Sequence, residues 1–228
     1  MLELIQNNYF FLLYFVALVL SILQYRKYYD TALKYLPILI TYTVLSEVLG
    51  FAVRNFDEIQ IVFIEEYEYY NTLIFNIFDI IFYLYFLSIY HKFFISKTSK
   101  KFAKLGVYLF IITSVLNLFL QNFYVEPQNW AIIIGSFFIT VCAFIYLTQL
   151  KNDKRILSTT NLLFWISIGI IFFHLFYPLT MYILSFKYEL YTNLKIAQFH
   201  YFSIAVLYTC FIIGFIKVKR TKPYEISN

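Results

Sequence analysis

The stretch Tyr70–Tyr90, YNTLIFNIFDIIFYLYFLSIY, decides the fold class, because it is apolar over a bilayer-crossing length and yet carries Asp79 near its middle. A transmembrane helix needs about 20 predominantly apolar residues. A carboxylate at the centre of such a helix costs about 2.5–3.5 kcal/mol, so we expect it to face a helix bundle and to have a partner there. At the helical period of 3.6 residues, one face of this stretch carries the polar residues Thr72, Asn76, Asp79, Tyr83 and Tyr90.

The composition of the whole chain agrees with a membrane protein. Of its 228 residues, 61% are hydrophobic and only 14% are charged, whereas about 25% are charged in ordinary soluble domains. Five glycines and four prolines leave little material for linkers. We therefore predict one transmembrane domain over residues 1–228 and no separate soluble module.

Seven apolar runs predict an all-α fold, a polytopic bundle of seven transmembrane helices. The expected spans are Tyr9–Tyr25, Tyr35–Val53, Tyr70–Tyr90, Leu105–Asn122, Asn129–Leu150, Asn161–Leu184 and Ile196–Lys217. The segment Met1–Asn8 contains no Lys or Arg, so the first span lacks the basic region of a cleaved signal peptide. We expect this span to be retained.

The basic residues predict the orientation. Of the 18 Lys and Arg residues, all but Arg54, Lys187 and Lys195 fall in the first, third and fifth connections or in the C-terminal tail. Because cytoplasmic loops are enriched in Lys and Arg, we predict the N-terminus outside and the C-terminus inside. The second connection, Arg54–Tyr69, is rich in Asp and Glu and would then form an acidic outer loop.

The charge pattern also bears on partners. The net charge of +5 comes from basic residues in short loops between apolar runs, which is a topological pattern. We therefore expect the lipid bilayer as a partner and no nucleic acid. Cys142 and Cys210 both lie in apolar runs, where we interpret them as small buried side chains.

Polar residues within the spans converge at one depth under this topology. The candidates for a ligand or proton cavity are Glu47, Asn76, Asp79, Asn117, His174 and His200. With a rise of about 1.5 Å per residue, the five other than Asn76 lie between about 6 Å and about 15 Å from the outer surface. We predict one polar cavity that opens outward. The alternative is that each group makes a separate contact between helices.

Three kinds of chemistry could use such a cavity. A carboxylate and an imidazole could sense a ligand or protons and shift the packing of the helices. Glu47, Asp79, His174 and His200 could instead bind zinc and support hydrolysis. A chain of titratable groups could also conduct ions or protons.

Three segments resemble the small orphan seven-helix membrane proteins of Bacteroidota-type bacteria. They are YNTLIFNIFDIIFY at Tyr70–Tyr83, FWISIGIIFF at Phe164–Phe173 and IAVLYTCFIIGFIK at Ile204–Lys217. In that group an acidic residue recurs in the second and third spans, at the positions of Glu47 and Asp79. Some of its members look like companions of signalling systems, so the resemblance implies a sensory role.

A second resemblance is to the seven-helix zinc hydrolases of the alkaline ceramidase and adiponectin-receptor superfamily, which act on membrane lipids. Their paired histidine ligands in the last span are missing here, because Ile204 stands at the fourth position after His200. Zinc is therefore the alternative cofactor. The principal expectation is that the chain has none, and a retinal Schiff base has no lysine inside the last span to form on.

These observations lead to one functional hypothesis. We expect a multi-pass protein of a bacterial inner membrane, without enzymatic activity, that acts as a sensory or regulatory module. Only 11 residues follow Lys217. We therefore expect the signal to pass to a separate cytoplasmic protein. A homo-oligomer is compatible with the same pattern.

Overall fold

The computed structural model describes residues 9–56, 58–67, 70–152 and 158–220, and this part of the chain forms helices and turns without β-strands. The α-helices are α2 (Tyr9–Leu23), α3 (Leu36–Asn55), α4 (Thr72–Phe93), α5 (Lys97–Leu120), α6 (Asn129–Asn152), α7 (Leu162–Phe186), α8 (Tyr188–Asn193) and α9 (Ile196–Lys217). Part of the topology prediction falls on residues outside those described. They are Met1–Asn8, Asp57, Glu68, Tyr69, Lys154, Arg155 and Lys222.

Six helices are long and apolar enough to cross a membrane, namely α3, α4, α5, α6, α7 and α9. Helix α2 is apolar but shorter, with 15 residues, and at about 1.5 Å per residue it is roughly 22 Å long. A hydrocarbon core is about 30 Å thick. The structure therefore supports six spans by length, and the seventh stays a prediction.

Local signals explain where several helices begin. Pro37 lies in the first turn of α3, where its missing N–H would have no partner in any case. Ser96 caps α5, because its Oγ accepts a hydrogen bond from the backbone N–H of Thr98 at 3.2 Å. Asn161 caps α7 in the same way, and its Oδ1 accepts from the N–H of Phe164 at 3.2 Å.

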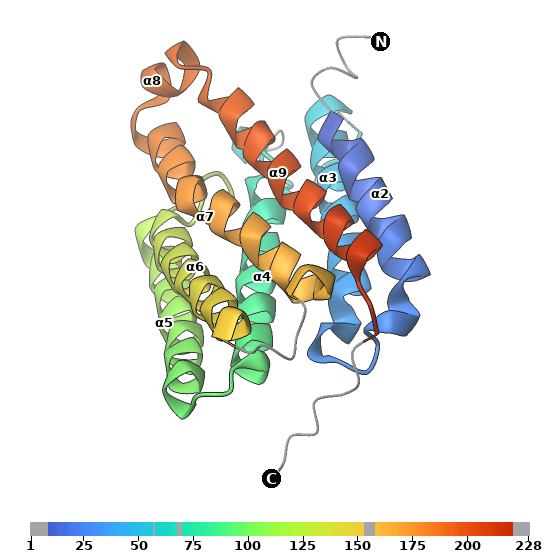
Figure 1. The fold of residues 1–228 in the computed structure, drawn as a ribbon. Coiled ribbons are helices and arrows are strands. Elements are labelled where there is room, and N and C mark those ends of the chain that lie inside the picture. Colours follow the sequence, from blue (N-terminus) through green and yellow to red (C-terminus); the bar gives the residue numbers. More distant parts are fainter. Residues whose placement is uncertain (1–8, 57, 68–69, 153–157, 221–228) are drawn as a thin grey trace.

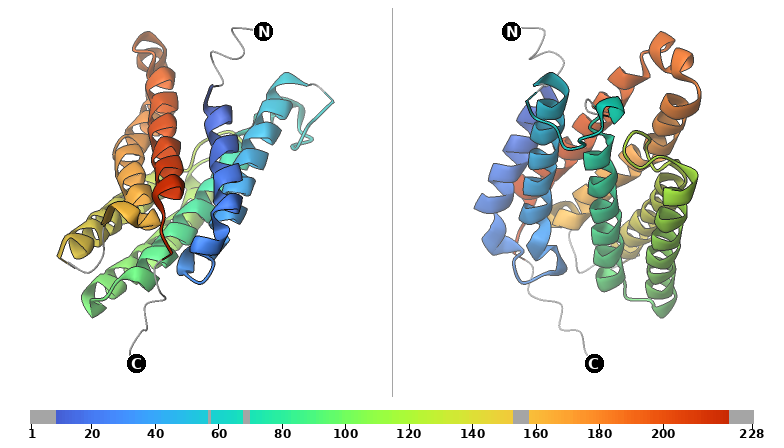
Figure 2. Two further views of the ribbon diagram at one scale, coloured as in Figure 1. Left: turned by 45° about the vertical axis from the view of Figure 1, so that its right-hand side comes forward. Right: turned by 180° about the vertical axis from the view of Figure 1, so that it is seen from behind.

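The helices form a ring, and Figures 1 and 2 show the bundle from the side. Extensive contacts join α2 to α3, α3 to α4, α4 to α6, α6 to α7, α7 to α9, and α9 back to α2. Helix α5 packs outside this ring against α4 and α6. In Figure 1, α2 begins at the upper end of the bundle and α9 ends at the lower end.

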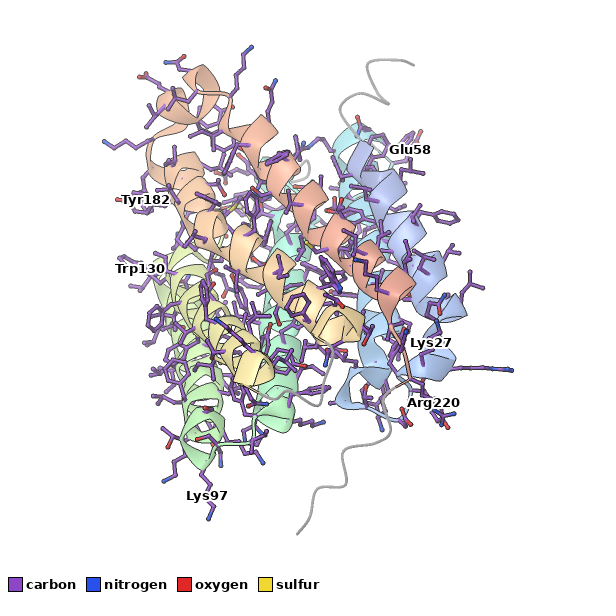
Figure 3. The ribbon with its side chains drawn as sticks, in the orientation of Figure 1. Lys27, Glu58, Lys97, Trp130, Tyr182 and Arg220 are labelled. Carbon is purple, nitrogen blue, oxygen red and sulfur yellow. The ribbon has the colours of Figure 1, made fainter. Side chains whose placement is uncertain are left out.

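The outer surface of the ring is apolar and aromatic, as a lipid-facing surface is. Phe119 is 83% exposed and Leu12 is 67% exposed, and Trp130 and Tyr182 project outward from the side of the bundle (Figure 3). Soluble monomers rarely expose such extensive apolar surface. Together with the six long apolar helices, this surface identifies a multi-pass membrane protein.

Candidate functional site

A cavity of about 340 Å³ lies inside the ring of helices. Its lining comes from α2, α3, α4, α7 and α9, from Asn71 just before α4, and from Pro127 in the α5–α6 connection. On α3 the lining extends from Thr43 to Arg54, the last turn of that helix, and on α9 it extends from His200 to Tyr208. The cavity therefore occupies the upper half of the bundle in Figure 1, where α2, α4 and α9 begin.

The cavity brings together five of the six side chains that the sequence singled out. They are Glu47 from α3, Asn76 and Asp79 from α4, His174 from α7 and His200 from α9. Four helices that are separated in the sequence thus contribute polar groups to one space. Asn117 is not among the lining residues. It is buried on α5, and its Nδ2 donates to Oε1 of Gln121 at 2.6 Å.

Each carboxylate in the cavity accepts a hydrogen bond from a buried tyrosine. The hydroxyl of Tyr177 donates to Oδ2 of Asp79 at 2.7 Å, and the hydroxyl of Tyr14 donates to Oε1 of Glu47 at 2.9 Å. The other oxygen of each carboxylate accepts no hydrogen bond from the described residues. Each acidic group is therefore held in place by the protein and keeps an acceptor for a further donor.

The two imidazoles also keep unused hydrogen-bonding capacity. Nδ1 of His174 lies 3.2 Å from the hydroxyls of both Tyr83 and Ser136, which are 2.6 Å apart. Nε2 of His174 and Nδ1 of His200 are buried and have no hydrogen-bond partner among the described residues. Buried polar atoms normally have partners. Both nitrogens are therefore available for a hydrogen bond beyond those that the described residues make.

Asn76 has a structural role that the sequence did not reveal. Its Nδ2 donates to the backbone oxygens of Phe123 and Glu126 at 2.8 and 2.9 Å, and its Oδ1 accepts from the N–H of Gln128 at 3.3 Å. The amide thus fastens the α5–α6 connection to α4. Asn76 lines the cavity, but its side-chain amide already forms hydrogen bonds with the backbone of this connection.

Aromatic side chains fill the bundle about one turn beyond the cavity lining on α4 and α9. The rings of Phe86 on α4 and Phe211 on α9 meet across the ring of helices, with their centroids 6.3 Å apart. Both side chains are almost fully buried, at 0% and 1% exposure. On the other side, the hydroxyl of Tyr208 donates to Oγ1 of Thr43 at 3.1 Å and joins α9 to α3. The cavity therefore ends inside the bundle.

Sequence reasoning did not select Tyr14 as a site residue. The chain contains 23 tyrosines, and helical periodicity alone does not distinguish the one that reaches a carboxylate on a neighbouring helix. Arg54 was interpreted as a loop residue, whereas it lies in α3 and lines the cavity.

A metal site in a protein needs three or more ligating side chains close together. Within residues 9–56, 58–67, 70–152 and 158–220, no group of three or more His, Cys, Asp and Glu side chains could hold a metal ion. Cys142 and Cys210 are buried free thiols. The alternative zinc set of Glu47, Asp79, His174 and His200 surrounds a cavity but does not form such a group.

No protein-family model, curated protein or solved structure matches the chain. The fold and the site together define its class, a helical multi-pass membrane protein with an internal cavity that carries a few polar groups.

The bond between Tyr177 and Asp79 leads to a first prediction. We expect Tyr177→Phe to lower the free energy of unfolding by about 1–3 kcal/mol, because a buried acceptor loses its donor. The matched control is Tyr182→Phe on the same helix, where the side chain is 44% exposed. Denaturant titration of the purified proteins in detergent checks this. Equal stability of the two variants would contradict the role given to this hydrogen bond.

Proposed function

We propose that the chain is a seven-span protein of a bacterial inner membrane that binds a small ligand from outside and signals to a separate cytoplasmic partner. The observation that carries the proposal is the convergence of Glu47, Asp79, His174 and His200 from four helices on one cavity of about 340 Å³. Small-molecule sites have volumes of about 300–1,000 Å³, with mostly apolar walls and a few polar groups. The resemblance to orphan seven-helix proteins is compatible with this role.

The orientation rests on the distribution of charge. Lys27, Lys97 and Arg220 lie at the lower end of the bundle, from which α9 exits, and Glu58 lies at the opposite end (Figure 3). Basic residues favour the cytoplasmic side. The cavity would then open toward the outside, and α2, which runs beside α3 and α9, would complete the seven spans.

A one-ended cavity favours binding over conduction. Conduction needs a continuous polar path, whereas Phe86 and Phe211 fill the space below the cavity. A ligand that contacts α3, α4, α7 and α9 together could change how these helices pack. Such a change in packing would be transmitted to the lower end of the bundle, where the basic residues lie, because α4 and α9 end there. The zinc-hydrolase alternative stays a prediction.

Cysteine labelling in intact cells tests the access and the orientation. We expect Ser46→Cys, a buried position that lines the cavity, to react with a small membrane-impermeant thiol reagent added outside. Glu58→Cys should react in the same way, Lys97→Cys only after the cells are permeabilised, and Ser167→Cys, which is 0% exposed, in neither case.

Two results would contradict this proposal. Labelling of Glu58→Cys without Ser46→Cys would show that the cavity is closed to the outside. Labelling of Lys97→Cys in intact cells would reverse the orientation. The native cysteines, which are both buried, are replaced by alanine in every variant so that only the introduced thiol reports.

A further inference from the structure

The charged side chains of the cavity select for a cation. Glu47 and Asp79 are acidic, and the basic residue of the lining is Arg54, seven residues and thus about 10 Å further along α3 than Glu47. The side chain of Arg54 is exposed and lies in the last turn of that helix. Carboxylates inside a membrane protein require a partner of opposite charge or a proton. With both carboxylates ionised, an anion would be repelled at this level of the cavity.

The walls of the cavity select for an organic cation over a bare metal ion. Phenylalanine rings surround the space, contributed by Phe10, Phe11, Phe51, Phe75, Phe78 and Phe82. Aromatic faces attract ammonium groups and bury apolar carbon at the same time. A metal ion needs several oxygen or nitrogen ligands at about 2.0–2.6 Å, and a space of about 340 Å³ is larger than one ion requires.

The hydrogen-bonding groups match an ammonium donor. The free oxygens of Glu47 and Asp79 are acceptors. Nε2 of His174 has no partner among the described residues, and the His174 side chain, which is only 3% exposed, is part of the cavity lining. It accepts a hydrogen bond in the tautomer that carries its proton on Nδ1. A primary ammonium has three N–H donors, so it could donate hydrogen bonds to these acceptors, which have no donor among the described residues.

We propose that the cavity binds an organic ammonium ion with a compact apolar body, held by Asp79 and Glu47 and enclosed by the aromatic walls. This inference rests on the proposed function and specifies its ligand. The ammonium group could belong to a free amine or to a lipid headgroup, and both offer the same chemistry to the carboxylates. Binding of the cation would neutralise charge inside the membrane and draw α3 toward α4.

The test uses the full chain in nanodiscs of phosphatidylglycerol, a lipid without an ammonium group. The cationic probes are 2-phenylethylammonium and cyclohexylmethylammonium, and the matched probes are neutral 2-phenylethanol and anionic 3-phenylpropanoate. We expect at least one cation to bind saturably, to raise the melting temperature and to slow labelling of Ser46→Cys. The neutral and anionic probes should bind at least about tenfold more weakly, because they lack the charged hydrogen bonds.

Variants assign the binding to the two carboxylates. Asp79→Asn and Glu47→Gln keep the shape of the side chain, and each should lower the affinity for the cation about tenfold or more. Glu58→Gln, in the exposed acidic loop, should leave the affinity unchanged. Gel filtration and unchanged labelling of Ser46→Cys in the absence of probe confirm that each variant is folded.

The outcomes separate this inference from the proposed function. If Ser46→Cys is labelled from outside but no cation binds, or if 2-phenylethanol or 3-phenylpropanoate binds equally well, the ammonium assignment is wrong and the outward cavity stands. Unchanged affinity in both carboxylate variants would also overturn it. Stabilisation by phosphatidylethanolamine nanodiscs alone, lost in Asp79→Asn, would support a lipid headgroup as the source, whereas binding of free amines in phosphatidylglycerol would support a soluble amine.

Discussion

Replacing Asn76 by alanine is expected to lower the free energy of unfolding by about 2–4 kcal/mol, because one side chain makes three hydrogen bonds to the α5–α6 connection. The substitution leaves two backbone oxygens and one backbone N–H without partners. The connection also carries Pro127, which lines the cavity. We therefore expect Asn76→Ala to loosen the mouth of the cavity and to speed up labelling of Ser46→Cys.

The matched control is Asn55→Ala, because Asn55 is exposed and donates to the backbone oxygen of Phe51 within its own helix at 2.7 Å. Its effect should stay within about 0.5 kcal/mol. Asn76→Asp should be nearly as damaging as Asn76→Ala, since a carboxylate oxygen would face two backbone oxygens. Thermal and denaturant unfolding in detergent measure all three variants. If Asn76→Ala is no less stable than Asn55→Ala, the amide does not fasten this connection.

The spans could be predicted from the sequence because membrane-spanning helices are long apolar segments, which hydropathy detects. Six predicted ranges match helices to within three residues at each end. The prediction for α5 began at Leu105, whereas the helix begins at Lys97. The four lysines between Lys97 and Lys104 ended the apolar window, but lysine is a good helix former, and Ser96 supplies the cap.

The first span was predicted to be longer than the helix that forms. The apolar pattern continues to Tyr25, but α2 ends at Leu23 and a 3₁₀ turn follows at Tyr25–Lys27. The short α8, Tyr188–Asn193, was not predicted, because it lies in a polar connection without helical periodicity. Composition therefore located the long helices better than the elements at their ends.

The candidate site could be predicted only in part. Depth along each helix follows from the topology, and it placed Glu47, Asp79, His174 and His200 at similar levels. Which helices are neighbours depends on side-chain packing between elements, and periodicity does not encode it. Amides were the least predictable, because Asn76 and Asn117 can bind a backbone or a side chain as readily as a ligand.

The contact between α7 and α9 depends on Gly169, and its replacement is expected to have the second large effect. These two helices share the most extensive contact between elements in the described part of the chain. A Cβ at Gly169 would lie 3.0 Å from Cβ of Cys210 and 3.1 Å from Cα of Leu207. Small residues allow such close approach of membrane helices, and a backbone atom cannot move aside as a side-chain tip can.

We expect Gly169→Ala to lower the free energy of unfolding by about 1–3 kcal/mol, the usual cost of overpacking, and Gly169→Leu to lower it further. The matched control is Gly50→Ala, where the new Cβ would meet the ring tip of Phe75 at 3.0 Å, a group that can move. Because α7 and α9 carry His174 and His200, separation of these helices should also weaken binding of the cationic probe. Gly169→Ala that is as stable as Gly50→Ala, with unchanged binding, would show that the two helices can move apart without affecting the cavity.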